Sequence, residues 1–327
     1  MALINVTIHS SQYPENVRRD LLESLRTRSV NHKCHYESYK QGQKWLALHE
    51  AFSPARTDPA CVAIYDEAFR AVAEQTAAPM VQVIGLGCGG GQKDARLVRL
   101  LTEAGKRVSY RPSDVSLPLV LTASEVVSRA AEVVLANPLV FDLAAAGDLR
   151  EIFPKAADST AVRLFGLFGM IPNFEPGIIV PAMAALLDKS DGLLFSANLA
   201  PGPDYAAGMK RILPGYDNAL TRDWLTTFLF DLGFEPADGT MRFAVEDSAQ
   251  GYQRIAAYFD LTRDRALSVY NERFAFRAGE SIRLFFSYRY TPELLATLFG
   301  RHGILVSRRW MASSGEEGVF FCQKEYN

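Results

Sequence analysis

A short apolar run that ends in a glycine-rich loop constrains the fold of this chain most strongly. Residues 80–84 read Met-Val-Gln-Val-Ile, and five of the next seven residues are glycine: Gly85, Gly87, Gly89, Gly90 and Gly91. A helical spacing of apolar residues follows over residues 94–104. A strand–loop–helix unit of this kind lets a ligand approach the backbone outside the carboxyl end of a parallel strand. We therefore predict a buried strand over residues 80–87 and a ligand at its end.

Strand patterns and helical patterns alternate through much of the chain. Further strands are predicted at residues 107–112, 139–142, 162–168 and 192–199, and helices at residues 120–136 and 177–187. Such alternation forms βαβ units, and hence a parallel sheet with right-handed crossovers. After a helix at 292–300, strands at 304–310 and 318–322 indicate a terminal antiparallel hairpin. The predicted fold is a doubly wound, Rossmann-like α/β sheet that ends in this hairpin.

Two segments fall outside the alternation. Residues 17–25 and 58–76 have helical spacing, and an irregular, aromatic stretch separates them. After residue 200, helical patterns at residues 220–232 and from Tyr252 onward precede an extended pattern at residues 267–276. We predict two domains: a substrate-binding domain from residues 1–78 and 200–279, and a ligand-binding sheet domain from residues 79–199 and 280–327.

Charge and hydropathy narrow the class of partner. The formal net charge is −2 and the pI about 6.2, so no surface for nucleic acid or an anionic membrane is indicated. Apolar stretches such as residues 178–187 fall short of the roughly 20 residues that span a bilayer, and no signal-peptide pattern is visible. The four cysteines form no CxxC pair, which favours reduced thiols over a zinc site. We expect a cytoplasmic protein that binds a small molecule and no metal, with its oligomeric state open.

Acidic residues end the second and third predicted strands. Asp114 lies 27 residues after Gly87, where a carboxylate can accept both ribose hydroxyls of an adenosine ligand; capping of the next helix is the alternative. Asp142 ends the third strand. The extra glycines at 89 and 91 do not fit the G-x-G-x-x-G spacing closely, so a dinucleotide oxidoreductase is a minority alternative.

Several motifs together resemble one enzyme family. Residues 86–89 with Lys93 resemble its LGSG…K loop, although Gly85 stands where an acidic residue is usual. Residues 110–116 resemble its Y-x-P-x-D-V-S segment, and residues 168–174 its G-x-T-I-G-N-L segment with a proline in place of one glycine. Three shorter matches lie later in the chain, at Tyr216-Asp217, residues 276–282 and residues 287–290. The chain resembles the histidine Nα-methyltransferases of ergothioneine biosynthesis and their fungal alkaloid N-methyltransferase relatives, class I methyltransferases that use S-adenosylmethionine.

The resemblance implies how a cofactor and a substrate are held. S-adenosylmethionine would contact the glycine loop, the lysine and the two carboxylates that end strands: Gly85, Gly87, Gly89, Lys93, Asp114 and Asp142. The asparagine and tyrosines that grip the amino and carboxylate groups of the family's substrate correspond to Asn173, Tyr216 and Tyr36, with Tyr39 as the alternative to Tyr36. Capping of the following helix is the alternative role for Asn173.

One departure from the family changes the expected substrate. Where the histidine-specific enzymes carry Thr-Glu, this chain has Leu284-Phe285, and a phenylalanine cannot accept a hydrogen bond from an imidazole. An unpaired buried N–H costs about 1–3 kcal/mol, a loss of roughly tenfold to over a hundredfold in binding. Two alanines, at 256 and 257, replace Glu-Met and would widen the pocket. We predict N-methylation of an amino acid or related small amine that is aromatic or apolar and not histidine, bound by Phe285, Ser287, Tyr258 and Ala257.

Other functions stay open at this point. An O- or C-methyltransferase of a specialised metabolite would need a general base, for which Tyr36, Tyr39 and His35 are candidates. A non-catalytic cofactor-binding protein is a second alternative, because the loop and the proline at 172 depart from the family motifs. The isolated histidines at 9, 49 and 302 are assigned no role, since a lone histidine is more often structural or solvated.

Overall fold

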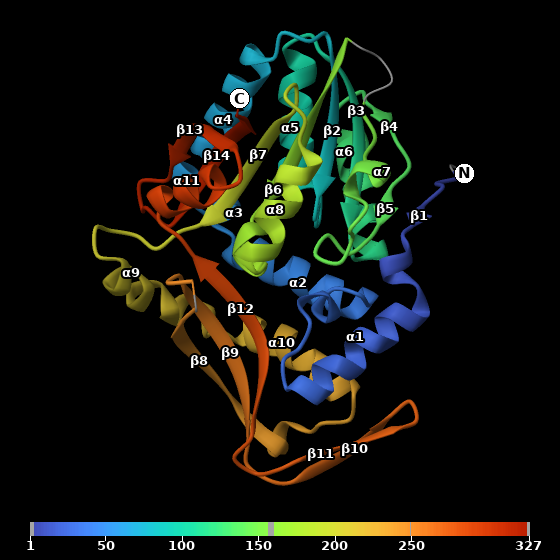
Figure 1. The fold of residues 1–327 in the computed structure, drawn as a ribbon, viewed down its shortest axis with the longest axis vertical. Coiled ribbons are helices and arrows are strands. Elements are labelled where there is room, and N and C mark those ends of the chain that lie inside the picture. Colours follow the sequence, from blue (N-terminus) through green and yellow to red (C-terminus); the bar gives the residue numbers. More distant parts are fainter. Residues whose placement is uncertain (1–2, 156–159, 249, 326–327) are drawn as a thin grey trace.

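A nine-stranded, mostly parallel sheet dominates the computed structural model, which describes residues 3–155, 160–248 and 250–325 (Figure 1). Its strand order is β1-β5-β3-β2-β6-β7-β14-β13, with β4 paired to β3. The strands are β1 (Thr7–Ile8), β2 (Met80–Leu86), β3 (Arg107–Asp114), β4 (Val134–Leu135), β5 (Leu139–Val140), β6 (Ala161–Phe168), β7 (Gly192–Asn198), β13 (Ile304–Met311) and β14 (Glu317–Lys324). The chain first builds outward from β2 through β3 and later returns on its other side as β6. The switch point of the sheet therefore lies between β2 and β6, where open α/β sheets bind ligands.

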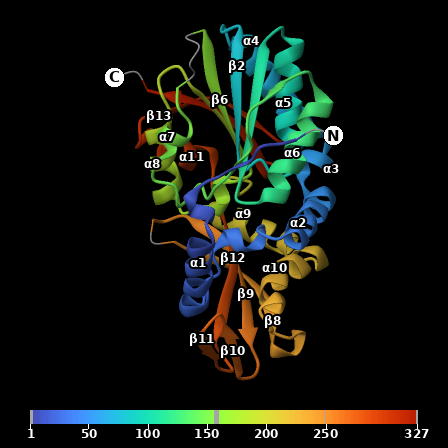
Figure 2. The same cartoon turned by 90° about the vertical axis from the view of Figure 1, so that its right-hand side faces the viewer.

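Helices cover both faces of this sheet (Figure 2). On one face lie α4 (Pro59–Gln75), α5 (Gln92–Glu103) and α6 (Leu117–Ala130), over a core that includes Val81 and Val83. On the other lie α7 (Leu149–Ile152), α8 (Pro176–Leu186) and α11 (Pro292–Gly300), over a core that includes Ile84 and Leu86. Strand β2 is thus buried on both faces, as its continuous apolar run predicts. The predicted doubly wound sheet is confirmed.

The predicted C-terminal hairpin is also confirmed. Strands β13 and β14 pair antiparallel, and β14 inserts beside β7, again antiparallel. Phe195 of β7 stacks on Phe320 of β14 with ring centroids 5.0 Å apart, and on Phe299 of α11 at 4.8 Å. These stacked rings attach the hairpin and the last helix to the parallel sheet.

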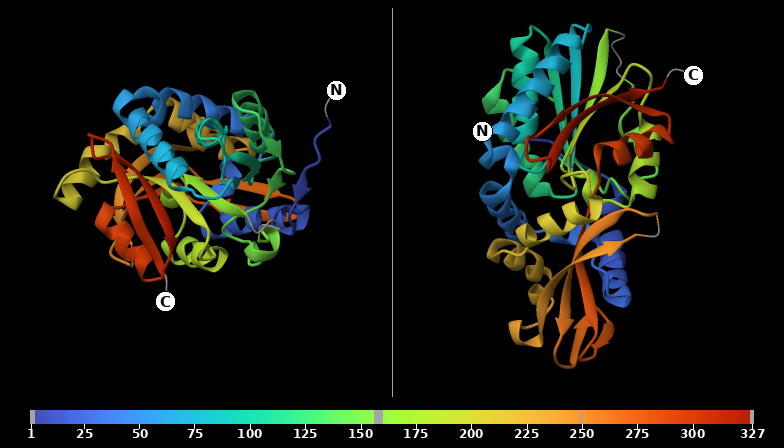
Figure 3. Two further views of the ribbon diagram at one scale, coloured as in Figure 1. Left: turned by 90° about the horizontal axis from the view of Figure 1, so that it is seen from above. Right: turned by 90° about the vertical axis from the view of Figure 1, so that its left-hand side faces the viewer.

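A smaller part of the molecule extends from the carboxyl edge of the large sheet (Figure 3). It contains a three-stranded antiparallel sheet in the order β12-β9-β8, from β8 (Gly239–Asp247), β9 (Gln253–Leu261) and β12 (Ser281–Arg289). Strands β10 (Arg265–Val269) and β11 (Glu272–Phe276) form a separate hairpin. Three helices pack on the small sheet around Leu25, Trp224 and Phe259, namely α1 (Pro14–Thr27), α2 (Tyr39–Phe52) and α10 (Ala219–Asp231).

Three sequence-based expectations are wrong. The segment from Tyr252 onward forms strand β9 between β8 and β12, and no helix. The stretch expected to be irregular contains helix α2, which starts with a capping box formed by Ser38 and Gln41. The helix expected at residues 120–136 ends at Ala130 and is followed by β4.

Helix α4 and strand β12 bear on the expected domain limits. Helix α4 packs on the large sheet, whereas β12 pairs with the small one. We propose that the substrate-binding part ends near residue 58 and resumes over residues 200–289. The remaining helices and short 3-10 turns are η1 (Ser10–Gln12), η2 (His32–His35), α3 (Pro54–Thr57), η3 (Ile171–Asn173), α9 (Tyr205–Ile212), η4 (Leu213–Tyr216) and η5 (Pro236–Asp238). Among the described residues, no helix combines the length and apolar character needed to cross a membrane.

Candidate active site

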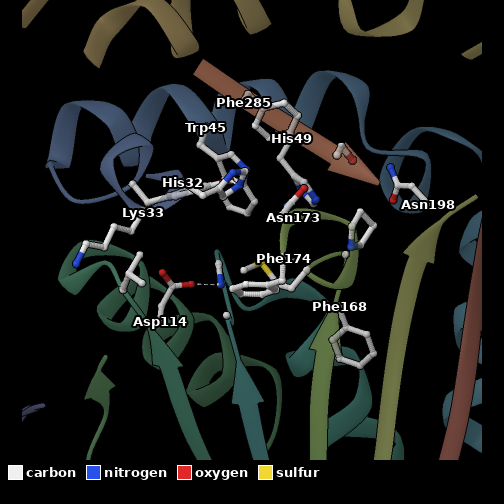
Figure 4. Close-up of a pocket in the computed structure, with 18 of the residues that line it drawn as sticks. His32, Lys33, Trp45, His49, Asp114, Phe168, Asn173, Phe174, Asn198 and Phe285 are labelled. Carbon is white, nitrogen blue, oxygen red and sulfur yellow. Dashed lines mark hydrogen bonds between the residues drawn. The ribbon is translucent and has the colours of Figure 1, made fainter. Parts of the chain in front are cut away.

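A cavity of about 770 Å³ lies between the carboxyl ends of the central parallel strands and the smaller part of the molecule (Figure 4). Side chains from α2 and β12 enter it from one side, and Asp114 enters it from the sheet. Most of the predicted site residues line this one cavity: Tyr36, Gly87, Gly89, Lys93, Asp114, Asp142, Asn173, Tyr216, Phe285 and Ser287. The sheet edge and the insertion thus form a single site.

The glycine loop presents bare backbone to the cavity. Gly87 and Gly89 have φ angles of 63° and 52°, a left-handed conformation that disfavours other residues. A Cβ on Gly89 would also lie 2.6 Å from the indole of Trp45, so the ring closes over the loop. The loop is therefore shaped by conformation and by close approach, as a ligand cradle requires.

Asp114 is fixed beside this loop. Its carboxylate accepts hydrogen bonds from the backbone N–H of Gly89 at 3.0 Å and of Ser116 at 3.1 Å. Burial raises the pKa of Asp114 to about 6, while the backbone N–H donors oppose that rise. Helix α6 takes Ser116 as its N-cap, so the helix-capping alternative for Asp114 is not what the structure shows.

Lys93 and Asp142 are held in place by polar and charged partners. The ammonium of Lys93 donates to the Tyr65 hydroxyl at 2.7 Å and lies 3.6 Å from Glu317 of the terminal hairpin. Asp142 accepts from the backbone N–H of Ala144 at 2.9 Å and lies 3.7 Å from the Lys33 ammonium. The hairpin and the N-terminal segment thus both help to position the two predicted cofactor contacts.

The predicted substrate contacts come from three other elements around the cavity. Asn173 stands in the short turn η3 after β6, and helix α8 takes Glu175 as its N-cap, so Asn173 does not cap that helix. Tyr216 ends η4 and its hydroxyl accepts two hydrogen bonds from Arg289. Ser287 is buried on β12 and faces the same space. Three elements far apart in sequence therefore converge on one region.

Aromatic rings surround Phe285. Its ring lies 5.0 Å from His32 and 5.8 Å from Trp224, measured between centroids. His32 Nε2 lies 3.1 Å from the hydroxyl of Tyr36, whose ring is 5.9 Å from Trp45. Burial, with a smaller effect from His35, lowers the pKa of His32 to about 3, and burial raises that of Tyr36 well above its ordinary value. Both groups are therefore neutral near pH 7, in a wall that suits a flat apolar ligand.

Four predicted contacts lie outside the cavity lining. Tyr39 is 69% exposed at the start of α2, so Tyr36 and not Tyr39 faces the cavity. Tyr258 donates its hydroxyl proton to Glu246, and Ala257 is buried in the core of the small sheet. Gly85 lies behind the loop, where a Cβ would meet Asp94. His35, a candidate base, is also buried away from the cavity, with Nε2 2.7 Å from the Leu284 carbonyl oxygen.

Several lining residues escaped sequence reasoning. His49, isolated in the sequence, lines the cavity and stacks on Trp45 with centroids 4.9 Å apart. The four-residue spacing within one helix would have placed both on the same face. His32, Asp94 and Arg289 also line the cavity, but only the tertiary fold brings them there.

A glycine cradle at the sheet's switch point, a fixed carboxylate after the neighbouring strand and a terminal antiparallel hairpin define the class I methyltransferases that use S-adenosylmethionine. The chain belongs to the histidine-specific, S-adenosylmethionine-dependent methyltransferase family, which matches residues 17–324.

Individual relatives are distant. The chain is 24% identical over 248 residues to the N-methyltransferase imqF of Aspergillus flavus, covering 72% of this chain and 66% of the relative. The chain thus spans slightly less than two thirds of that protein's length. Solved structures with a similar fold include 1,6-didemethyltoxoflavin-N1-methyltransferase of Burkholderia thailandensis, 13% identical with a TM-score of 0.42 over 88% of this chain and 89% of that one. The methyltransferase CcbJ of Streptomyces caelestis is 13% identical with a TM-score of 0.38, over 81% and 96% of the two chains.

Proposed function

We propose that this enzyme N-methylates an amino acid or a related small amine with an aromatic or apolar side chain, and not histidine. The observation that carries the proposal is Phe285, which lines the cavity among His32, Tyr36 and Trp224 at the position where the resembling enzymes hold a glutamate. Phe285 itself offers no acceptor to an imidazole N–H, whereas an aromatic ring can pack against it.

Five of the residues that line the cavity would contact the cofactor. The backbone of Gly87 and Gly89 would lie against the cofactor, Asp114 would accept its ribose hydroxyls, and Lys93 and Asp142 would contact its polar groups. The bare loop and the buried carboxylate of Asp114 fit such a ligand. When bound, S-adenosylmethionine supplies an electrophilic methyl group for in-line displacement.

The protein's part in the reaction is orientation. Asn173 and Tyr216 would hold the amino and carboxylate groups of the acceptor, with Tyr36 beside its side chain. An amine must be neutral to attack, yet His32, with a pKa of about 3, is a weak base. The acceptor amine would therefore bind in the neutral form that is present in solution, and the enzyme would gain rate as the pH rises towards the amine's own pKa.

Mass spectrometry tests the proposal directly. The purified chain is incubated with S-adenosylmethionine and, in separate reactions, tryptophan, tyrosine, phenylalanine and histidine, and each product is fragmented to locate the added methyl. Methylation of an α-amine in an aromatic amino acid, with histidine untouched, supports the assignment. Methylated histidine would refute the argument from Phe285, and methyl on oxygen or carbon would favour the alternative acceptors.

Asn173 offers an internal control for the same assay. Asn173→Ala should reduce turnover by about tenfold or more, since it removes a hydrogen bond that orients the reacting amine. Binding of S-adenosylhomocysteine should stay within about twofold of the unaltered chain. Unchanged turnover would remove Asn173 from the acceptor site.

A further inference from the structure

The carboxylate of Asp94 fills a space that two glycines leave open. A Cβ on Gly85, in β2, would lie 2.5 Å from Asp94 Oδ2, and a Cβ on Gly166, in the adjacent β6, would lie 3.4 Å from Asp94 Oδ1. Gly85 is absent from the described residues with positive φ, so it is required for space and not for conformation. Helix α5 therefore places an acidic side chain beneath the end of β2, at the switch point of the sheet.

Asp94 has one hydrogen-bond donor and no cationic partner in the described part of the chain. The Tyr110 hydroxyl donates to its Oδ2 at 2.6 Å, and no ion pair within 4.0 Å involves it. Its neighbour Lys93 points to Tyr65 and Glu317 instead. Asp94 is only 2% exposed, yet it belongs to the cavity lining. A buried carboxylate without a counter-charge is costly, so this position calls for a cation from the cavity.

The electrostatics of the site agree with this geometry. Burial raises the pKa of Asp94 to about 7, although Tyr110 and Lys93 oppose the rise. A bound cation would favour the ionised form and would lower that pKa again.

We propose that Asp94 binds the α-ammonium group of the methionyl part of S-adenosylmethionine. Its carboxylate would stand in for the acidic residue that is usual in the family at the position of Gly85. Asp114, in β3, would hold the ribose, and Asp94, beneath the loop that follows β2, would hold the other end of the same ligand. In this chain the carboxylate would thus come from the first turn of α5, and not from β2. This inference rests on the cofactor and is independent of the proposed acceptor.

Calorimetry with two ligands isolates the ammonium contact. S-adenosylhomocysteine carries the amino-acid moiety, whereas 5′-methylthioadenosine keeps the adenosine and thioether without it. Asp94→Asn preserves an acceptor for Tyr110 and should weaken S-adenosylhomocysteine binding by about ten- to a hundredfold, the value of a charged hydrogen bond. Binding of 5′-methylthioadenosine should stay within about twofold, which also shows that the site is folded.

A swapped variant gives a second, independent readout. Asp94→Ala combined with Gly85→Asp returns the carboxylate to the strand. The first substitution removes the atom 2.5 Å from the new Cβ, and the Tyr110 hydroxyl at 3.1 Å and Cys88 Cβ at 3.2 Å must then shift by a few tenths of an ångström. It should bind S-adenosylhomocysteine more tightly than Asp94→Ala alone, with 5′-methylthioadenosine unaffected. Equal weakening for both ligands in Asp94→Asn, or no recovery in the swap, would assign Asp94 a structural role and overturn the inference. Neither outcome would alter the acceptor assay.

Discussion

Arg289 donates two hydrogen bonds to the hydroxyl oxygen of Tyr216, from Nε at 3.0 Å and from Nη2 at 2.7 Å. Since the oxygen is already accepting, the hydroxyl proton of Tyr216 is free to be donated into the cavity. Arg289 is 7% exposed, and no carboxylate lies within 4.0 Å of it among the described residues. A buried cation that holds a hydroxyl in this way favours an anionic group on the ligand.

Tyr216→Phe should therefore distinguish acceptors by their carboxylate. We expect kcat/KM for a carboxylate-bearing acceptor such as tryptophan to fall by about ten- to a hundredfold, because one hydrogen bond to a charged group is lost. The decarboxylated amine, tryptamine, should lose less than about threefold. Steady-state kinetics with both acceptors check the difference, and an equal loss for the two would contradict a carboxylate contact.

Tyr36 and Tyr39 form a matched pair for a second prediction. The Tyr36 hydroxyl is buried beside His32, whereas Tyr39 is 69% exposed and outside the cavity lining. Tyr36→Phe should lower kcat/KM by about tenfold, while Tyr39→Phe should change it by less than about twofold. Both variants should unfold at the same temperature to within a few degrees, measured by thermal denaturation. A larger kinetic effect at Tyr39 would reverse the assignment.

A substitution at Phe285 tests specificity through a gain of activity towards histidine. Phe285→Glu returns a hydrogen-bond acceptor to the wall, and we expect it to allow detectable methylation of histidine while reducing that of apolar acceptors by about tenfold. Phe285→Leu is the control, since it changes the shape without adding an acceptor. Competition between histidine and an aromatic amino acid, followed by mass spectrometry, measures the shift. Equal histidine activity in the two variants would show that the residue does not decide specificity.

The sequence anticipates the large sheet well and the insertion poorly, for physical reasons. Strand β2 and its loop can be predicted locally, because an apolar run indicates a buried strand and clustered glycines indicate a loop with left-handed backbone. Strand β9 is central in its sheet and has Ile255, Ala256 and Ala257 buried in succession. Burial on both faces removes the alternation that marks a strand, so the alanine-containing run resembles a helix. Strand β9 is stabilised by pairing with β8 and β12, and β12 is separated from it in the chain by the β10–β11 hairpin.

The site residues, too, were easier to predict in the large sheet than in the insertion. Motif positions such as Asp114 and Asn173 line the cavity as expected, because Asp114 ends β3 and Asn173 lies in the turn after β6, both in the predictable sheet. Tyr258 was misplaced because strand orientation in the insertion could not be predicted, and its hydroxyl instead donates to Glu246. The sequence does carry one local signal for α2: Ser38 and Gln41 have the spacing of a capping box, which marks the start of the helix and hence the face that carries Trp45.

His49 should make the stability of the folded protein sensitive to acid. Burial, with smaller effects from the charges of Lys93 and Arg56, lowers the pKa of His49 to about 3 from an ordinary value of 6.5. A group whose pKa is lower in the folded state contributes stability above its unfolded pKa, and that contribution is lost as the pH falls towards the folded one. The window therefore runs from about pH 6.5 down to about pH 3.

His49→Gln removes this titration while other buried groups continue to respond to pH. The free energy of unfolding of the unaltered chain minus that of the variant should fall by about 1.4 kcal/mol per pH unit between pH 6 and pH 4. Urea denaturation at several pH values measures both chains under the same conditions. A difference that stays constant over this range would mean that His49 titrates normally in the folded protein, and that the wall beside Trp45 admits water.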